Sequence, residues 1–463
     1  MSGPPALPGG ADSALFTDLY ELTMAAAYLA DNNQGTATFE LWVRDPGERN
    51  FLVAAGLDTA LRHLEALHFD EADLFYLGSL RRFTPGFLEF LAGLRFTGEV
   101  WALPEGTIAF AREPLLRVTA PIIEAQLAET FLLNAVGFQT LIASQAARVT
   151  LAAAGRPWVD FGARRAHGVD AGLGAARSAW LAGAAATSLL LAGREWGLPV
   201  TGTMAHSYVL SHPSERAAFL SFARTLPDDG VFLIDTFDTL QGARAAAEAA
   251  RELAGEGIRV AGVRLDSGDL AELAHGVRAI LDEAGFPGIR ILASGGLDEH
   301  SVARLVAAGA PIDGFGVGTR LATGGDEPSL DTVYKLVEDG RGPQMKTSTG
   351  KVTLPGVKQT YRVEEGRLLR ADTIALAGET ATAGRPLLQQ VMVEGRRLGP
   401  PEPPGAARER CRAGLASLPA PLCSLETAAA SPVDVSPRLA RLARELSAGR
   451  RAVPGSPPPG RLH

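Results

Sequence analysis

The sequence has few cysteines and no long apolar run, and both shortages narrow the class of protein. Cys411 and Cys423 are its two cysteines among 463 residues, so we expect neither a disulfide framework nor a cysteine-based zinc site. The longest uncharged apolar stretch, between Arg177 and Arg194, is shorter than the ~20 residues of a membrane-spanning helix. The N-terminus has no basic region before an apolar segment. We therefore expect a cytoplasmic protein with no membrane partner.

Positively charged residues are fewer than negatively charged ones. The chain has 44 Lys and Arg against 52 Asp and Glu, a formal net charge of −8. An acidic surface repels DNA, RNA and anionic lipids, so we expect no nucleic-acid partner. A small anionic ligand must then be held by a local basic pocket. The 46% of hydrophobic residues allows a buried core, and the length favours two or three domains.

The middle of the chain has the pattern of a βα barrel. Short apolar runs recur there and most precede a helical pattern; they lie at 198–201, 231–234, 258–265, 289–293 and 312–317. Runs that are apolar throughout indicate strands buried on both faces, and spacings of roughly 30 residues are typical of βα units. We predict an α/β barrel over residues 126–330.

Polar or glycine-rich clusters follow these runs, where a barrel carries its active site. The clusters are Gly202-Thr-Met-Ala-His-Ser207, Asp235-Thr236, Asp266-Ser-Gly-Asp269, Ser294-Gly-Gly296 and Gly316-Val-Gly-Thr319. His206 in the first cluster is a candidate base, or a nucleophile toward a phosphoryl group. The alternative is a packed structural histidine.

Charged residues in the later clusters suit an anionic ligand and a cation. Arg264 and Asp266 share one side of an extended chain, which suits an anion and a cation or ribose, or else an ordinary salt bridge. Asp235 and Asp269 are candidate Mg²⁺ ligands, because Mg²⁺ is commonly held by one or two carboxylates plus phosphates. Asp269 is equally a candidate helix N-cap.

Further anion sites are predicted from arginine and glycine. Arg164 and Arg165 follow Gly162, and such guanidinium groups bind carboxylate or phosphate in a bidentate way, unless this is a solvated loop. The glycine-rich turns at 294–296 and 314–319 suit phosphate. The sequence has no G-x-x-x-x-G-K-[ST] loop and no H-E-x-x-H motif.

The flanks are predicted to differ from the barrel. We expect a flexible segment at 1–12, a β-rich domain from 13–125 and 331–397, and a Pro/Ala/Arg-rich tail at 398–463 with a short helix at 437–448. Residues 98–119 alternate between apolar and polar and carry turn residues, which predicts a small antiparallel β module.

Motifs over residues 13–395 resemble the nicotinate phosphoribosyltransferase family. They are Thr17-Asp-Leu-Tyr-Glu-Leu-Thr-Met24, Phe51-Leu-Val-Ala-Ala-Gly-Leu57, Asp160-Phe-Gly-Ala-Arg-Arg-Ala166, Gly202-Thr-Met-Ala-His-Ser207, Ile234-Asp-Thr-Phe-Asp-Thr239, Gly262-Val-Arg-Leu-Asp-Ser-Gly-Asp269, Ala293-Ser-Gly-Gly-Leu-Asp298, Phe315-Gly-Val-Gly-Thr319, Val333-Tyr-Lys-Leu336 and Leu354-Pro-Gly356. The resemblance implies a type II phosphoribosyltransferase: an irregular TIM-like α/β barrel with a β-rich domain built from both chain ends. It also implies a homodimer with composite active sites.

The activity implied by the resemblance is ATP-coupled and belongs to NAD salvage. Phosphoribosyl passes from 5-phosphoribosyl 1-diphosphate to nicotinate, giving nicotinate mononucleotide and diphosphate, with Mg²⁺ as the expected metal. A nicotinamide-using enzyme of the same fold is the nearest alternative, and Arg164 with Arg165 favours the acid. A catalytically silent barrel is the second alternative, against which His206, Arg264 and Asp266 argue.

The resemblance also implies roles for single residues. His206 matches the histidine that ATP phosphorylates, and Tyr20, with Asp18, matches an aromatic residue that the partner subunit stacks on the pyridine ring. Arg164 matches an arginine near ring and phosphates, and Arg264 with Asp266 a pair beside ribose and base. The remaining substrate-binding candidates are Thr203, Ser207, Ser294, Gly295, Gly296, Gly318 and Thr319.

Two positions depart from the family pattern. Leu189 stands where the family usually has asparagine, which removes a polar contact to phosphate. Ala163 replaces a residue that is often leucine, which loosens the wall of the pocket.

Overall fold

The fold was analysed in a computed structural model, which describes residues 13–228, 230–348, 353–379, 383–425 and 431–451. The segment expected to be flexible, 1–12, lies outside these residues. The chain divides into two compact units: Met1–Leu141 with Ser329–His463, and Ile142–Pro328. We call them the terminal unit and the central unit. No helix within the described ranges is long and apolar enough to cross a membrane.

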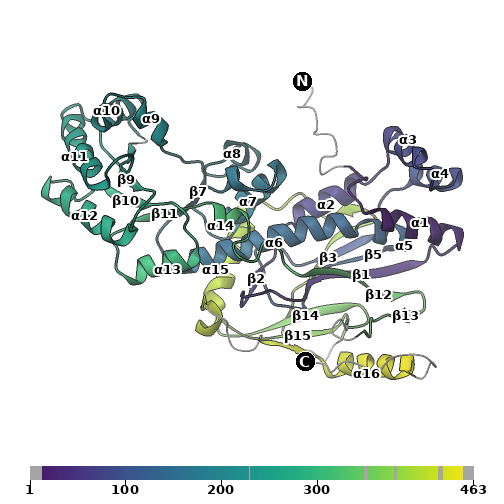
Figure 1. Cartoon of the computed structure of the whole chain (residues 1–463). Coiled ribbons are helices and arrows are strands. Elements are labelled where there is room, and N and C mark those ends of the chain that lie inside the picture. The colour runs from purple at the N-terminus through teal and green to yellow at the C-terminus, as the bar shows by residue number, and fades with distance from the viewer. Residues whose placement is uncertain (1–12, 229, 349–352, 380–382, 426–430, 452–463) are drawn as a thin grey trace. The chain divides into compact units, whose positions relative to one another are not determined.

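The central unit contains a curled parallel half-barrel of six strands in the order β7-β6-β11-β10-β9-β8. The strands are β6 (Trp158–Asp160), β7 (Ala186–Thr187), β8 (Val231–Leu233), β9 (Gly262–Leu265), β10 (Arg290–Ala293) and β11 (Gly314–Val317). Helices flank the sheet (Figure 1): α7 (Val169–Leu181), α8 (Leu190–Trp196), α9 (His206–Leu210), α10 (Glu215–Thr225), α11 (Thr239–Gly255), α12 (Leu270–Glu283), α13 (Glu299–Ala307) and α14 (Thr319–Ala322). The predicted class, an irregular α/β barrel, is confirmed.

One predicted strand of the barrel is wrong. Residues 198–201 form no strand, and Val200 makes only an isolated parallel bridge to Thr187. Pro199 has no N–H to donate to a ladder, which accounts for the interruption. Conversely, β6 and β7 were not predicted. The apolar run of β6, Trp158-Val159, has two residues, and β7 lies in an alanine-rich stretch, so neither stands out as the four-residue run at 231–234 does.

The terminal unit is rich in β structure and draws on both chain ends, as predicted. Its largest sheet has the order β13-β12-β1-β5-β3-β17-β18, so N-terminal strands lie between C-terminal ones. These strands are β1 (Thr36–Val43), β3 (Glu99–Ala102), β5 (Pro114–Pro121), β12 (Thr332–Asp339), β13 (Gly342–Pro343), β17 (Gln389–Val393) and β18 (Arg396–Arg397). β1 pairs antiparallel with both β5 and β12.

Smaller sheets and helices complete this unit. The sheets are β16-β14-β15-β19 and β2-β4, made of β2 (Leu52–Val53), β4 (Ile108–Ala109), β14 (Lys358–Glu365), β15 (Leu368–Leu376), β16 (Arg385–Pro386) and β19 (Val433–Val435). The helices are α1 (Leu19–Ala30), α2 (Leu57–Ala66), α3 (Glu71–Ser79), α4 (Pro85–Gly93), α5 (Ile122–Leu127), α15 (Pro404–Ser417) and α16 (Pro437–Arg451). Helix α6 (Glu129–Ala152) continues from this unit into the central one.

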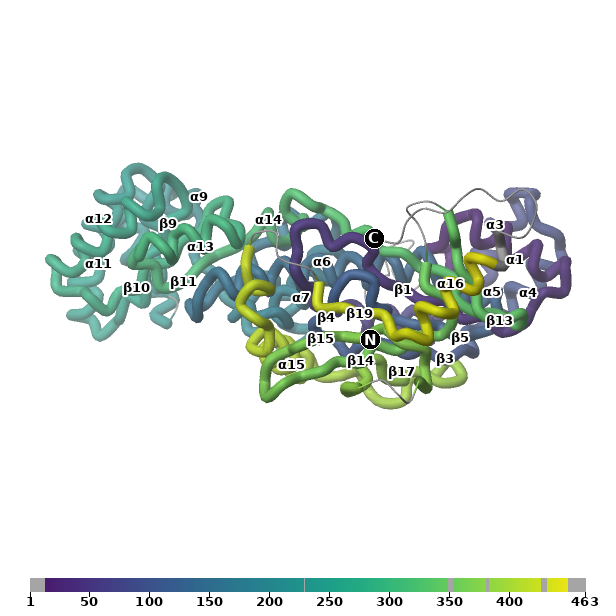
Figure 2. Tube along the Cα trace, turned by 90° about the horizontal axis from the view of Figure 1, so that it is seen from below, coloured from purple at the N-terminus to yellow at the C-terminus, as the bar shows by residue number. Residues whose placement is uncertain are grey.

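The tail contains more structure than the single short helix expected at 437–448. Besides α16, it contributes α15 and strand β19, which pairs in parallel with β15. Both helices pack against β15, and the yellow C-terminal segment lies along this sheet (Figure 2). Cys411 is buried in α15, and both cysteines are free.

A buried ion pair connects the two chain ends within the terminal unit. Lys358 Nζ of β14 lies 2.9 Å from Glu40 Oε2 of β1, and both side chains are almost fully buried. The ammonium also donates to the carbonyl oxygens of Leu354 (2.9 Å) and Gly356 (2.7 Å). Burial lowers the pKa of Lys358, while Glu40 opposes that shift. The pair thereby fixes the Leu354-Pro-Gly356 motif to the large sheet.

Removing one member of this pair should destabilise the terminal unit strongly. Lys358→Met leaves Glu40 charged and buried, so we expect a loss of about 3–5 kcal/mol in the free energy of unfolding. The double variant Glu40→Leu, Lys358→Met should regain most of it. Arg370→Met, which breaks an exposed pair with Glu365, is the control and should change little. Urea unfolding followed by circular dichroism measures all three; equal losses for Lys358→Met and Arg370→Met would contradict the account.

Candidate active site

A cavity of about 590 Å³ lies in the central unit beside the carboxyl ends of β6, β7 and β9. Three predicted site residues line it: Arg164, Thr203 and Arg264. Both departures from the family pattern, Ala163 and Leu189, also belong to the lining. The other lining residues are Phe161, Gly168, Val169, Gly172, Leu173, Ser188, Leu191, Gly202, Met204 and Ala205. The wall is therefore largely apolar, with two guanidinium groups.

The carboxylate of Asp160 shapes one side of this cavity. Asp160 ends β6, is 1% exposed, and accepts hydrogen bonds from Gly162 N and Thr187 Oγ1, both at 2.8 Å. Burial raises the pKa of Asp160, and the two hydrogen bonds oppose that shift. Thr187 Oγ1 in turn accepts from Leu189 N at 3.1 Å. Asp160 thus holds the turn that carries Arg164; its place at the head of the 160–166 motif was the signal for this role, which sequence reasoning missed.

Arg264 presents an incompletely bonded guanidinium to the cavity. Its Nη2 donates to the carbonyl oxygen of Met204 at 3.2 Å, and its Cζ lies 5.9 Å from the Phe161 ring centroid. Its Nε is buried with no hydrogen-bond partner in the structure. Burial lowers the pKa of Arg264, against the effect of Asp266, and Arg164 lowers it further. An anion bound in the cavity would be attracted by both guanidinium groups.

His206 begins helix α9, next to the cavity-lining segment 202–205. Its Nδ1 lies 3.2 Å from Thr236 Oγ1, which comes from the segment after β8. This contact fixes one ring nitrogen of a half-buried imidazole. Ser207, in the same turn, is exposed.

The ends of β8, β9 and β10 are joined by side-chain hydrogen bonds. Asp235 Oδ2 accepts from Asp266 N (2.9 Å) and from Ser267 Oγ (2.7 Å). Ser294 Oγ donates to Asp266 Oδ1. The structure therefore brings together three residues predicted from separate motifs: Asp235, Asp266 and Ser294.

The two candidate magnesium ligands differ in their free oxygens. Asp269 is the N-cap of α12, its Oδ1 accepting from Ala271 N and Glu272 N at 3.1 Å each. Asp235 Oδ1 is buried without a hydrogen-bond partner, which fits a cation. No group of three or more His, Cys, Asp or Glu among the described residues is placed to hold a metal ion. A magnesium ion here would need further oxygens from water or phosphates.

The glycine turn after β10 depends on close backbone contact. Gly295 has φ +93°, and a Cβ there would stand 1.8 Å from the Asp266 carbonyl oxygen. Gly296 also has positive φ, +66°, but faces open space. After β11, a Cβ on Gly318 would lie 3.0 Å from the Phe161 carbonyl oxygen, and Thr319 begins α14. Both turns expose backbone at the same edge of the sheet.

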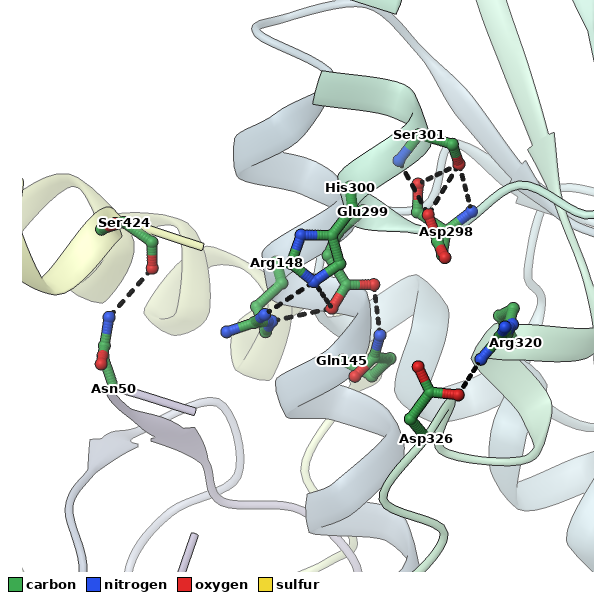
Figure 3. A network of polar contacts seen from close by, with 10 residues as sticks. All are labelled: Asn50, Gln145, Arg148, Asp298, Glu299, His300, Ser301, Arg320, Asp326 and Ser424. Carbon is green, nitrogen blue, oxygen red and sulfur yellow. Dashed lines mark hydrogen bonds and ion pairs between the residues drawn. The ribbon is translucent and has the colours of Figure 1, made fainter. Parts of the chain in front are cut away.

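A buried polar network anchors the helix that follows the first glycine turn (Figure 3). Asp298 caps α13 by accepting from Ser301 N at 2.8 Å. Glu299 in the first turn accepts from Arg148 Nε at 2.9 Å and from Gln145 Nε2, both on α6. Because Arg148 and Glu299 are almost fully buried, this pair fixes the start of α13 firmly.

Tyr20 and Asp18 belong to the terminal unit rather than to the cavity's unit. Tyr20 lies in the first turn of α1 and is 45% exposed, although burial of part of the side chain and the nearby Glu129 raise its pKa. Asp18 Oδ2 accepts from Thr130 Oγ1 at 3.0 Å. Their role at the pyridine ring remains a prediction.

Known proteins resemble this chain over most of its length. The model of the nicotinate phosphoribosyltransferase N-terminal domain matches residues 15–137. The nicotinate phosphoribosyltransferase pncB2 of Mycobacterium tuberculosis is 52% identical over 451 residues, 96% of each chain. That of Bacillus subtilis is 44% identical over 377 residues, 79% of this chain and 76% of its own.

Solved structures agree with these relatives. The human nicotinic acid phosphoribosyltransferase matches with a TM-score of 0.82 and 31% identity, over 93% of this chain and 99% of that one. The nicotinate-nucleotide pyrophosphorylase of Pyrococcus furiosus, with a TM-score of 0.72 and 24% identity over 89% of this chain and 97% of its own, shares the fold. With its motifs, fold and close relatives in agreement, this chain belongs to the nicotinate phosphoribosyltransferase family.

Proposed function

We propose that this chain transfers phosphoribosyl from 5-phosphoribosyl 1-diphosphate to nicotinate in NAD salvage in the cytoplasm, coupled to ATP hydrolysis. The observation that carries the proposal is the pair of guanidinium groups, from Arg164 and Arg264, that line one mostly apolar cavity. In an acidic protein, two guanidinium groups in a mostly apolar pocket suit a flat aromatic carboxylate.

In this reaction the bond from ribose C1 to the diphosphate oxygen breaks, and the pyridine nitrogen forms a bond to C1. Positive charge develops on the sugar, and the carboxylate of Asp266, held by Ser294, is placed to stabilise it. The turns at Gly295–Gly296 and Gly318–Thr319 offer backbone for the 5′-phosphate, which fixes the sugar for attack. Thr203, which lines the cavity, and Ser207 of α9 are further candidates for polar contacts with the substrates. Mg²⁺, when bound, would neutralise the departing diphosphate, with Asp235 as its ligand and Asp269 as a weaker candidate.

Coupling to ATP is assigned to His206. Its contact with Thr236 orients the imidazole beside the acidic ends of β8 and β9, where ATP and Mg²⁺ would meet it. A phosphoryl group on His206 would add charge at the rim and so shift the site between conformations that bind substrates and release product.

A homodimer completes the proposal. Tyr20 and Asp18 would be supplied by the partner subunit, with the Tyr20 ring stacked on the pyridine. The exposure of Tyr20 on α1 is consistent with this role, because an aromatic side chain in the first turn is open to contact.

The assay that tests this function compares nicotinate with nicotinamide. The protein is incubated with 5-phosphoribosyl 1-diphosphate, Mg²⁺ and either base, with and without ATP, and mononucleotide is measured. We expect product from nicotinate, more with ATP, and little from nicotinamide. Preference for nicotinamide would point to the amide-using enzyme of this fold, and no product from either base to a silent barrel.

His206→Ala should separate transfer from coupling. We expect the variant to lose stimulation by ATP while keeping some ATP-independent transfer, because the ring is needed only for the phosphoryl step. His212→Ala is the control, since His212 lies beyond the C-terminal end of α9 and its ring contacts the Tyr208 carbonyl oxygen (2.8 Å) rather than Thr236. Full ATP stimulation in His206→Ala would contradict the assignment.

Gly295→Ala should damage substrate binding more than Gly296→Ala. Both positions have positive φ, but only Gly295 would collide with the Asp266 backbone. We expect the KM for 5-phosphoribosyl 1-diphosphate to rise at least about tenfold in Gly295→Ala, a cost of 1.4 kcal/mol or more, and only a few-fold in Gly296→Ala. Equal KM values in the two variants would contradict the close approach.

A further inference from the structure

The carboxylate of Glu21, the residue after Tyr20, is fully buried and lies outside the proposed reaction site. It lies in the first turn of α1 and is 0% exposed. Its Oε2 accepts from Thr17 Oγ1 at 2.6 Å, and its Oε1 accepts from Thr130 N at 3.0 Å and from Thr130 Oγ1. These bonds attach the start of α1, including Tyr20, to the start of α6.

A second carboxylate shares this environment. Glu129 precedes Thr130 on α6 and accepts from Gln126 Nε2 at 2.7 Å; its other oxygen lies 3.5 Å from Lys335 Nζ. Glu129 is close enough to Tyr20 to raise the pKa of the Tyr20 hydroxyl. The residue after Tyr20, Glu21, is the one whose hydrogen bonds fix the start of α1.

The environment of Glu21 favours its neutral form. Burial raises the pKa of Glu21 to about 7, the bonds from Thr130 and Thr17 oppose the shift, and Glu129 adds to it. The remaining groups that face it are Asp18, which shares the Thr130 hydroxyl, and the buried phenol of Tyr334 on β12. Lys335 is the cation of this cluster, and it pairs with Glu129 rather than with Glu21.

We propose that Glu21 is a positioning residue for Tyr20, and that a negative charge on Glu21 weakens the binding of nicotinate. The inference rests on the proposed function, in which Tyr20 contacts the pyridine ring. The physical reason is twofold. A charged Glu21 repels the neighbouring Glu129, which disturbs the contact between the start of α1 and the start of α6 that positions Tyr20. It also adds a negative charge beside Tyr20, where the proposed site must accept an anionic ring.

The sign of the pH effect follows from this. Below about pH 7 Glu21 is protonated and above it Glu21 is charged, whereas nicotinate is an anion across this range. We therefore expect the KM for nicotinate to rise about fivefold between pH 6 and pH 8.5. The dependence of kcat on pH should be the same in wild type and in the Glu21 variants, because Glu21 does not contact the reacting atoms.

The test is the pH profile of Glu21→Gln. Glutamine keeps an acceptor oxygen for Thr130, and its NH2 group can donate to the Thr17 hydroxyl, but it cannot gain charge, so its KM for nicotinate should stay low and nearly flat. Glu21→Ala loses the hydrogen bonds and should raise KM at every pH. Glu124→Gln is the matched control. Glu124 is a partly buried carboxyl of α5 that accepts a hydrogen bond from Thr97 N, and we expect its replacement to leave the pH profile of the KM for nicotinate as in wild type.

The outcomes separate the two proposals. A KM profile in Glu21→Gln that rises in parallel with wild type overturns the role of Glu21 while leaving the proposed function intact. Absence of mononucleotide from the wild-type protein at every pH overturns the proposed function and this inference together.

Discussion

The close approach of two strand ends in the central unit is the constraint on which the candidate site depends. The backbone after β9 comes so near the turn after β10 that a Cβ on Gly295 would stand 1.8 Å from the Asp266 carbonyl oxygen. The same approach lets Ser294 donate to the Asp266 carboxylate, while the Asp266 backbone N–H donates to Asp235. Sugar, phosphate and cation sites can then share one edge of the sheet, because parallel strands end there together.

Much of this arrangement follows from the sequence, because short apolar runs that end in Asp, Ser or Gly are easy to recognise when they recur at βα spacing. The turns after β8 to β11, with Asp235, Asp266 and Ser294, were predicted in this way. The cavity wall was harder to predict. Strands β6 and β7 lack a distinct apolar run, and the bond between Asp160 and Thr187 joins residues far apart in the chain. The apolar pattern at 198–201 did not take account of the missing N–H of Pro199. The α15–β19 part of the tail was settled by tertiary packing, which local propensity does not determine.

The terminal unit contributes buried charge. Its N-terminal and C-terminal strands are joined by the pair of Glu40 and Lys358, and its first helix is attached by Glu21. Burial raises the pKa of Glu21, whose partners are hydrogen-bond donors without charge, whereas Glu40 is paired with the ammonium of Lys358. Glu21 and Glu40 thus perform different tasks in the same unit: one can regulate how Tyr20 is presented, and the other keeps the sheets together.

The central claim is that the cavity beside Arg164 and Arg264 holds the pyridine carboxylate while the glycine turns hold the phosphate. The most direct measurement is a crystal structure of the protein with nicotinate mononucleotide. The account predicts the ring carboxylate within hydrogen-bond distance, ~3.2 Å or less, of a guanidinium nitrogen of Arg164 or Arg264, and the phosphate against the backbone at Gly295–Gly296 or Gly318–Thr319. A nucleotide bound outside this cavity, or with its phosphate on Arg264 and its ring away from the cavity wall, would contradict the account.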